Sequence, residues 1–234
     1  MNKIIVPLFI FFSVVLSIFT SCQKNEGYTP TTDSISSLPE ITFTDIENNV
    51  YHGVYIGSQI WSKENLRVSH YRDGTAITEV TDQTLWNGMS DTMYLYCKYN
   101  NENYLGSQYG YLYSRNVIFN DTLQIAPPGW RIPTIADWDT LFAYLGGAAV
   151  AASKMREAGT SHWIGPNNSN NSSGFTALPA GYRTVFGFEN LSVKGKFWAL
   201  WPYVSYRIDG SNAVLSDSSV SRQDAYSIRL IKAY

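Results

Sequence analysis

The chain has 234 residues, a formal net charge of −2, and equal shares of aromatic and charged residues, 15% each. A pI near 5.9 leaves no basic excess, so we expect no nucleic-acid partner. The apolar share of 44% is too high for a disordered chain. Two cysteines exclude a small fold dense in disulfides, and three scattered histidines predict no zinc cluster.

The first residues have the layout of a bacterial signal peptide. Lys3 precedes an apolar run that reaches Phe19, and two small residues then stand before Cys22. The run is shorter than the roughly 20 residues that a spanning helix needs. This arrangement resembles a lipobox, although Phe19 stands where leucine is usual. We predict removal of a signal peptide, residues 1–21, and lipid on Cys22; the alternative is an ordinary secreted protein.

The segment after the predicted anchor reads as a tether. Residues 22–39 are rich in Ser, Thr and Pro and show no apolar period. An anchor and a tether predict an outer-membrane lipoprotein of the cell envelope, periplasmic or surface-facing, with the membrane as a partner. Residues 40–234 suffice for one domain with a full core. Lipid on Cys22 leaves Cys97 without a partner, and its aromatic surroundings predict a buried thiol.

Short strands open the predicted domain. Apolar alternation predicts strands over residues 41–46 and 50–56, and a third strand begins at Ile60. Asn-containing and Gly-containing turns separate these runs, which is typical of antiparallel hairpins.

The clearest helix signal lies in mid-chain. Thr134 and Asp137 have the spacing of an N-cap and an acidic residue three positions later, so we interpret Asp137 as a cap residue rather than a catalytic acid. Apolar side chains then recur along one helix face, at Trp138, Leu141, Phe142 and Leu145. Two glycines end this pattern. A weaker helical pattern covers residues 148–157.

Strand character returns in the last third of the chain. It follows a polar loop, residues 160–173, and covers residues 175–178, 196–208, 213–215 and 225–233. Many short strands with one or two helices in mid-chain predict an α+β fold with an antiparallel sheet.

Six blocks of sequence occur in order along the domain. They cover residues 45–66, 109–113, 128–138, 174–183, 197–198 and 226–229. The most specific one contains Pro-Gly-Trp-Arg-Ile-Pro-Thr at residues 128–134. Together the blocks resemble the Fibrobacter succinogenes major paralogous domain, a family common in lipoproteins of Bacteroidetes-type bacteria. The resemblance implies a C-type-lectin-like fold that is also similar to formylglycine-generating enzymes.

The chain departs from this family at two positions. Relatives usually have Cys where this chain has Ala126 and Leu230. The resemblance implies that those cysteines form a bridge in relatives. Here two apolar residues replace them, and the chain forgoes about 2–4 kcal/mol of cross-link stabilisation.

Catalytic and metal-binding sets are not recognisable in the sequence. Cys97 alone cannot supply a two-thiolate copper site. His52, His70 and His162 are far apart, and no Gly-x-Ser-x-Gly elbow occurs. The acidic strings of lectin-type calcium sites are missing as well. We therefore expect no enzyme activity, no cofactor and no resident metal.

Aromatic residues in loops are the remaining candidates. Trp163 stands in a loop rich in Asn and Ser, where a ring can stack on a sugar while amides bond its hydroxyls; a core position is the alternative. The resemblance implies a ligand face in late segments, which adds Trp201, Tyr203 and Tyr206 as candidates. Aromatics within the family blocks are expected in the core, at Trp61, Trp130, Trp138, Phe175, Tyr182 and Trp198.

These observations predict a lipid-anchored, non-enzymatic module of the cell envelope. Its partner would be a glycan or a cell-surface protein, bound through loops. Two alternatives remain open: a structural component of an envelope or adhesin assembly, and an enzyme of unknown reaction.

Overall fold

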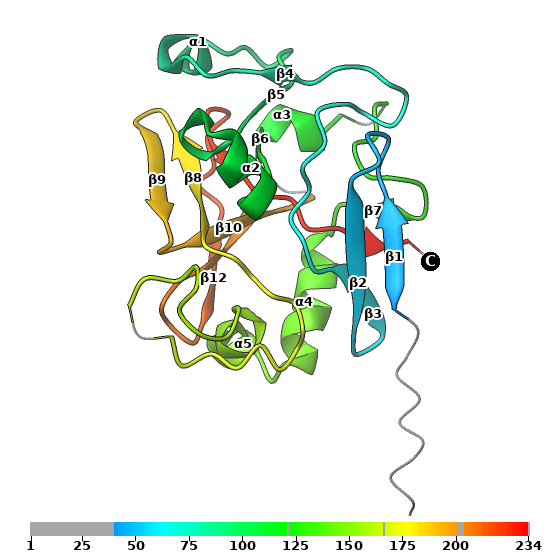
Figure 1. Cartoon of the computed structure of the whole chain (residues 1–234), viewed down its shortest axis with the longest axis vertical. Helices are drawn as coiled ribbons and strands as arrows, with labels where there is room; N and C mark the ends of the chain where they lie inside the picture. Colours follow the sequence, from blue (N-terminus) through cyan, green and yellow to red (C-terminus); the bar gives the residue numbers. More distant parts are fainter. Residues whose placement is uncertain (1–39, 121, 166, 201–203, 234) are drawn as a thin grey trace, which may run out of the picture. The chain divides into compact units, whose positions relative to one another are not determined.

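Two sheets of short strands organise the domain (Figure 1). The computed structural model describes residues 40–120, 122–165, 167–200 and 204–233. Outside the described residues lie the predicted signal peptide 1–21, the predicted tether 22–39 with Cys22, and the candidates Trp201 and Tyr203. None of the described helices combines the length and the apolar character needed to cross a membrane.

The first sheet has five strands in the order β1-β2-β3-β14-β7. Their bounds are β1 Ile41–Thr44, β2 Val50–Ile56, β3 Gln59–Ser62, β7 Trp130–Arg131 and β14 Ile231–Lys232. All neighbours pair antiparallel, and the two amino-terminal hairpins confirm the predicted strands. Asn48 and Gly57 take positive φ at the two turns, as tight hairpins require.

The second sheet has nine strands. Its main path runs β12-β11-β10-β8-β13-β6-β5-β4, and β9 pairs with β8 beside it. The bounds are β4 Thr78–Glu79, β5 Leu95–Cys97, β6 Leu112–Ser114, β8 Ala180–Thr184, β9 Gly187–Leu191, β10 Gly195–Ala199, β11 Val204–Ile208, β12 Val214–Asp217 and β13 Ala225–Tyr226. The pairs β4–β5 and β8–β10 are parallel. The carboxy-terminal segment joins both sheets, because β13 lies in the second and β14 in the first.

Five short α-helices and one 3₁₀ turn lie in the described part of the chain. They are α1 Gln83–Asn87, η1 Tyr99–Asn101, α2 Asn103–Tyr109, α3 Arg115–Ile118, α4 Ile135–Tyr144 and α5 Ala148–Met155. Figure 1 shows α4 and α5 at one end of the domain and α1 at the other. The predicted mid-chain helices are confirmed, and Thr134 and Asp137 form a complete capping box. The helices α1–α3 were not predicted, since four to seven residues are too few to show a period.

The predicted α+β, C-type-lectin-like fold class is wrong, because the structure is β-rich. Fourteen strands form the two sheets, whereas the helices of the described region have four to ten residues each. Many of these strands have only two to four residues and form by pairing with distant segments, so the sequence pattern gives them too little weight. The predicted strand at residues 175–178 is only an isolated bridge from Ala177 to Arg156.

Aromatic side chains fill the core, which explains their abundance. Each of the six tryptophans that the structure describes is at most 5% exposed. The expected core residues are confirmed as buried, except that Tyr182 is half-buried. Cys97 is fully buried as predicted, and burial raises the pKa of its thiol to about 12. Ala126 and Leu230 are buried in the same hydrophobic cluster, so apolar packing occupies both positions where relatives have cysteine.

Three buried arginines connect the packed loops. Arg156, Arg183 and Arg229 are each at most 2% exposed. Each donates to backbone carbonyls and lies over at least one aromatic ring. No carboxylate lies within ion-pair distance of these three guanidinium groups among the described residues. Carbonyl dipoles and ring faces therefore replace counter-ions around them.

Candidate functional site

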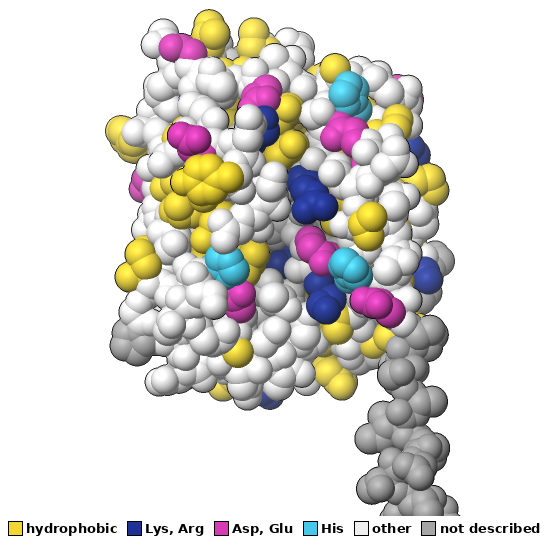
Figure 2. All heavy atoms as spheres, in the orientation of Figure 1, with side chains coloured by type: hydrophobic (Ala, Val, Ile, Leu, Met, Phe, Trp, Pro, Cys, Tyr) yellow, Lys and Arg dark blue, Asp and Glu magenta, His cyan; other side chains and the backbone are white. Residues whose placement is uncertain are grey.

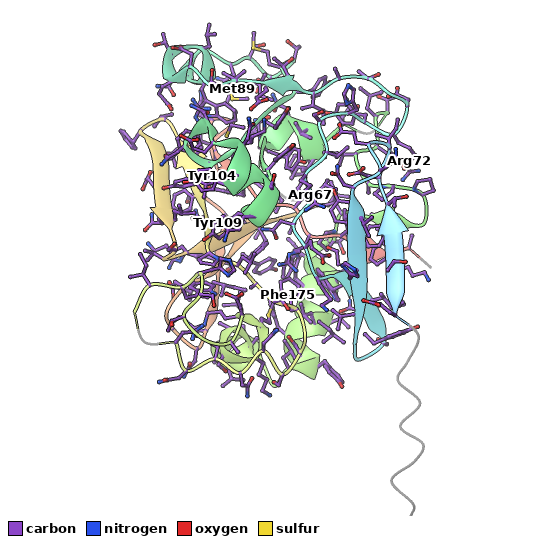
Figure 3. The ribbon with its side chains drawn as sticks, viewed as in Figure 1. Arg67, Arg72, Met89, Tyr104, Tyr109 and Phe175 are labelled. Carbon is purple, nitrogen blue, oxygen red and sulfur yellow. The ribbon has the colours of Figure 1, made fainter. Side chains whose placement is uncertain are left out.

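A polar groove of about 310 Å³ opens on one face of the domain. Figure 2 shows charged side chains of both signs gathered in the middle of this face, and Figure 3 places Arg67 there. The lining residues come from the segment after β3, the end of α2 and the segment before β8. They are Lys63, Glu64, Asn65, Arg67, Ser107, Gln108, Gly110, Thr176 and Leu178.

The wall of the groove is built on Arg229. Its Nε donates to Asn65 Oδ1 at 2.6 Å, and its Nη2 donates to the Thr176 carbonyl at 2.8 Å. Its Nη1 donates to the carbonyls of Ser62 and Phe175 at 2.9 and 2.7 Å. Burial lowers the Arg229 pKa to about 9, which still leaves a cation at neutral pH. One side chain thus holds two walls of the groove together.

The end of α2 is pressed closely against this wall. The Tyr111 amide donates to the Leu66 carbonyl at 2.9 Å, and Asn65 Nδ2 donates to the Tyr109 carbonyl at 2.8 Å. Gly110 lies between them with φ +79°, and a Cβ at this position would stand 2.6 Å from the Asn65 Cβ. Glycine is therefore required where the third wall meets the other two.

The rim carries two cations and one carboxylate. Glu64 accepts from His52 Nδ1 at 2.7 Å and from the His52 amide at 2.8 Å. Arg67 donates from Nε to Asn49 Oδ1 at 3.3 Å and from Nη1 to the Ser107 carbonyl at 3.5 Å. Lys63 is exposed. Both acceptors of Arg67 are thus neutral, and Glu64 places one negative charge beside the two cations.

An exposed aromatic ring lies on α2, the helix that supplies one wall of the groove. Tyr104 lies on α2 and is 64% exposed. Ser107 and Gln108 follow it three and four positions later, so all three lie on one side of the helix. Figure 3 shows Tyr104 and Arg67 on the same open face. The ring therefore lies on the same side of α2 as the Ser107 hydroxyl and the Gln108 amide.

The two ligand-binding candidates predicted from the sequence that the structure describes, Trp163 and Tyr206, do not line the groove. Trp163 is 4% exposed, its Nε1 donates to the Ala177 carbonyl at 3.2 Å, and Arg156 lies over its ring. Tyr206 is 6% exposed and packs against Trp138, and burial raises the pKa of its hydroxyl to about 12. Neither ring offers a face to a ligand. The ligand-binding roles of Trp201 and Tyr203 stay predictions.

Sequence analysis missed the groove residues. Four residues that form or support the walls belong to the blocks that carry the family resemblance: Asn65, Gly110, Thr176 and Arg229. The blocks could have pointed to these residues, but no spacing in the chain shows that they lie together. No sequence pattern indicated that Tyr104 or Arg67 belongs to a site. The helix of Tyr104 has only seven residues, and the neighbours of Arg67 come from distant segments.

A second pocket is lined mainly by apolar residues. It has a volume of about 220 Å³, and its walls include Trp130, Ile132 and Leu200. Its wall residues Asn120 and Leu200 are each followed in the chain by a residue outside the described part. Every residue that lines the polar groove has described neighbours, and more polar groups converge there. The polar groove is therefore the better candidate site.

The fold and the groove define a β-rich domain with an open polar groove on one face. The Fibrobacter succinogenes major domain family matches residues 54–232, which is most of the chain, so the protein belongs to that family. The match confirms the resemblance seen in the sequence and includes every residue that lines the groove. Comparison with curated proteins and with solved structures gave no match.

Proposed function

We propose that this protein is a lipid-anchored, non-enzymatic module of the cell envelope that binds a glycan in the polar groove. The observation that carries the proposal is that the exposed Tyr104 ring lies on α2 one turn before Ser107 and Gln108, which line the groove. A ring face can stack on the apolar face of a sugar, while amide, hydroxyl and guanidinium groups bond its hydroxyls.

The dimensions of the groove also support a small saccharide. Its volume of about 310 Å³ is at the lower end of the range for small-molecule sites. The walls are held by Arg229 and by the close contact at Gly110, so the site is largely formed before a ligand arrives. A preformed site loses little conformational entropy on binding.

A structural role in an envelope assembly is the second candidate, and a different surface favours it. Phe186, at the turn between β8 and β9, is 90% exposed, and Leu85 on α1 is 67% exposed. Gln83 and Asn87 donate to the Val185 carbonyl at 3.3 and 3.1 Å and so join α1 to this turn. Exposed apolar side chains held in this way suit contact with another protein.

The test is glycan binding by paired variants of the full chain in detergent. We expect Tyr104→Ala to lower affinity for a bound oligosaccharide by about tenfold, equivalent to about 1.4 kcal/mol of lost stacking. Tyr144→Ala is the matched control, because Tyr144 is also 64% exposed and lies on α4, outside the groove. Equal losses in both variants, or no binding across a broad glycan array, would contradict the proposal.

A further inference from the structure

We infer that the groove selects an acidic sugar, one that carries a carboxylate, over its neutral counterpart. This inference rests on the proposed glycan-binding function and names the ligand class of the same site. It is argued from the charges at the rim, the unused donor of Arg67 and the buried cation behind the wall.

The rim has an excess of positive charge. Lys63 and Arg67 line the groove together with one carboxylate, Glu64. Both Glu64 oxygens already accept hydrogen bonds from His52, one from the ring and one from the amide. Neither Lys63 nor Arg67 lies within ion-pair distance of a carboxylate in the described part of the chain. The rim therefore keeps a net positive charge, with one carboxylate against two cations, and a ligand anion would break no close ion pair that the structure describes for either cation.

The Arg67 side chain is held in place by two hydrogen bonds, and one of its donor nitrogens is not used within the described part of the chain. Asn49 accepts from its Nε, Ser107 accepts from its Nη1, and the guanidinium carbon lies 5.7 Å from the centre of the Tyr51 ring. Its Nη2 has no partner among the described residues. Because a guanidinium is rigid and planar, a side chain held at Nε and Nη1 presents Nη2 in a fixed direction, where it can donate to a carboxylate oxygen.

Arg229 adds a third positive charge behind the wall. All four of its acceptors are neutral, and two of them belong to the groove residues Asn65 and Thr176. The side chain is fully buried, where water screens its charge poorly. The Glu64 carboxylate offsets part of this field. The remainder adds to the positive charge of Lys63 and Arg67.

The neighbouring ring favours a sugar acid over an acidic peptide. Tyr104 offers its face one helical turn from Gln108, and Gln108 and Ser107 add an amide and a hydroxyl to the same wall. An acidic peptide needs the cations but has no use for a stacking platform. A uronic or sialic acid uses the ring, the amide and the cations together.

The experiment compares each acid with its own methyl ester on the full chain in detergent. The probes are trimers of galacturonic acid and of glucuronic acid, and sialyllactose, and affinity is measured by titration calorimetry. We expect at least one acid to bind about tenfold more tightly than its ester, which corresponds to about 1.4 kcal/mol. This preference should shrink when the salt concentration is raised from about 0.02 to about 0.5 M, because ions screen exposed charges.

Variants then assign the preference to the groove. Arg67→Gln should remove most of the difference between acid and ester, with a smaller loss of affinity for the ester because the guanidinium also bonds sugar hydroxyls. The exposed Lys63→Gln should reduce the difference without risk to folding. Arg222→Gln is the matched control, since Arg222 is exposed, lies 3.5 Å from Asp91 and does not line the groove. Preserved acid preference in both groove variants would overturn the inference.

The remaining outcomes separate this inference from the proposed function. Equal binding of acid and ester overturns the acidic class and leaves glycan binding standing. Absence of binding by every acid and every ester, with no hit on the neutral glycan array, overturns both. Binding of hexaglutamate as tight as that of the best sugar acid, and unaffected by Tyr104→Ala, overturns the choice of a sugar in favour of a peptide.

Discussion

Arg229 Nη1 donates to the Phe175 carbonyl at 2.7 Å while the guanidinium carbon lies 4.5 Å from the centre of the Phe175 ring. One residue thus supplies both a hydrogen-bond acceptor and a π face to the same buried cation. The other donors of Arg229 reach Ser62, Asn65 and Thr176. The cation therefore connects the segment after β3, the segment before β8 and the carboxy-terminal segment.

Removal of the Arg229 guanidinium should be strongly destabilising. We expect Arg229→Met to lower the free energy of unfolding by about 3 kcal/mol or more, because several buried acceptors lose their donor at roughly 1–3 kcal/mol each. Arg229→Lys keeps the charge but not the fork and should fall between Met and wild type. Urea unfolding measures the differences. A loss below about 1 kcal/mol in Arg229→Met would show that the network matters little.

The steric effect of a side chain at residue 110 can be measured separately from the cost of a positive φ. Gly110 and Gly129 share φ +79°, but a Cβ at Gly129 meets nothing within 4 Å, whereas one at Gly110 meets Asn65 and the Leu66 carbonyl. We expect Gly129→Ala to cost about 1 kcal/mol from φ alone and Gly110→Ala to cost about 3 kcal/mol or more. Thermal unfolding of both variants tests this, and equal losses would rule out a steric role for Gly110.

The cap of α4 should make part of the stability depend on pH. Burial acts to raise the Asp137 pKa, but hydrogen bonds from Arg131 and Thr134 hold it below its usual value of 3.8. A lowered folded-state pKa stabilises the fold above the unfolded value, and this contribution is lost as pH falls through the folded value. We expect Asp137→Asn to cost about 1–2 kcal/mol near pH 7 and much less near pH 2.

Urea unfolding at both pH values measures this cost, with Asp139→Asn as the control. Asp139 lies on the same helix, is exposed and forms no part of the capping box. A deficit of Asp137→Asn that persists unchanged near pH 2 would contradict the ionic role of the cap.

Cys97 should be unreactive in the folded protein. Its thiol is fully buried, and burial raises its pKa to about 12, so almost no thiolate forms at neutral pH. In a Cys22→Ser background, we expect a thiol reagent to modify Cys97 only as fast as the domain opens, and rapidly in denaturant. Fast modification under native conditions would show that the segment around β5 opens far more often than its burial suggests.

Several features of the protein follow from the sequence alone because they depend on neighbours close in the chain. The capping box joins Thr134 to Asp137, three positions apart, and the hairpin turns near Asn48 and Gly57 need only local backbone geometry. The burial of Cys97 follows from the apolar residues beside it. Family membership was also readable, because six blocks occur in the correct order.

Only the tertiary structure decided the fold class and the site. Strands as short as β13 and β14 exist because each pairs with a segment far away in the chain, and no local pattern announces such pairing. Arg229 and Asn65 meet across 164 positions. The groove depends on which distant segments come together, and that depends on packing of the whole core, whereas caps and turns depend on a few consecutive residues.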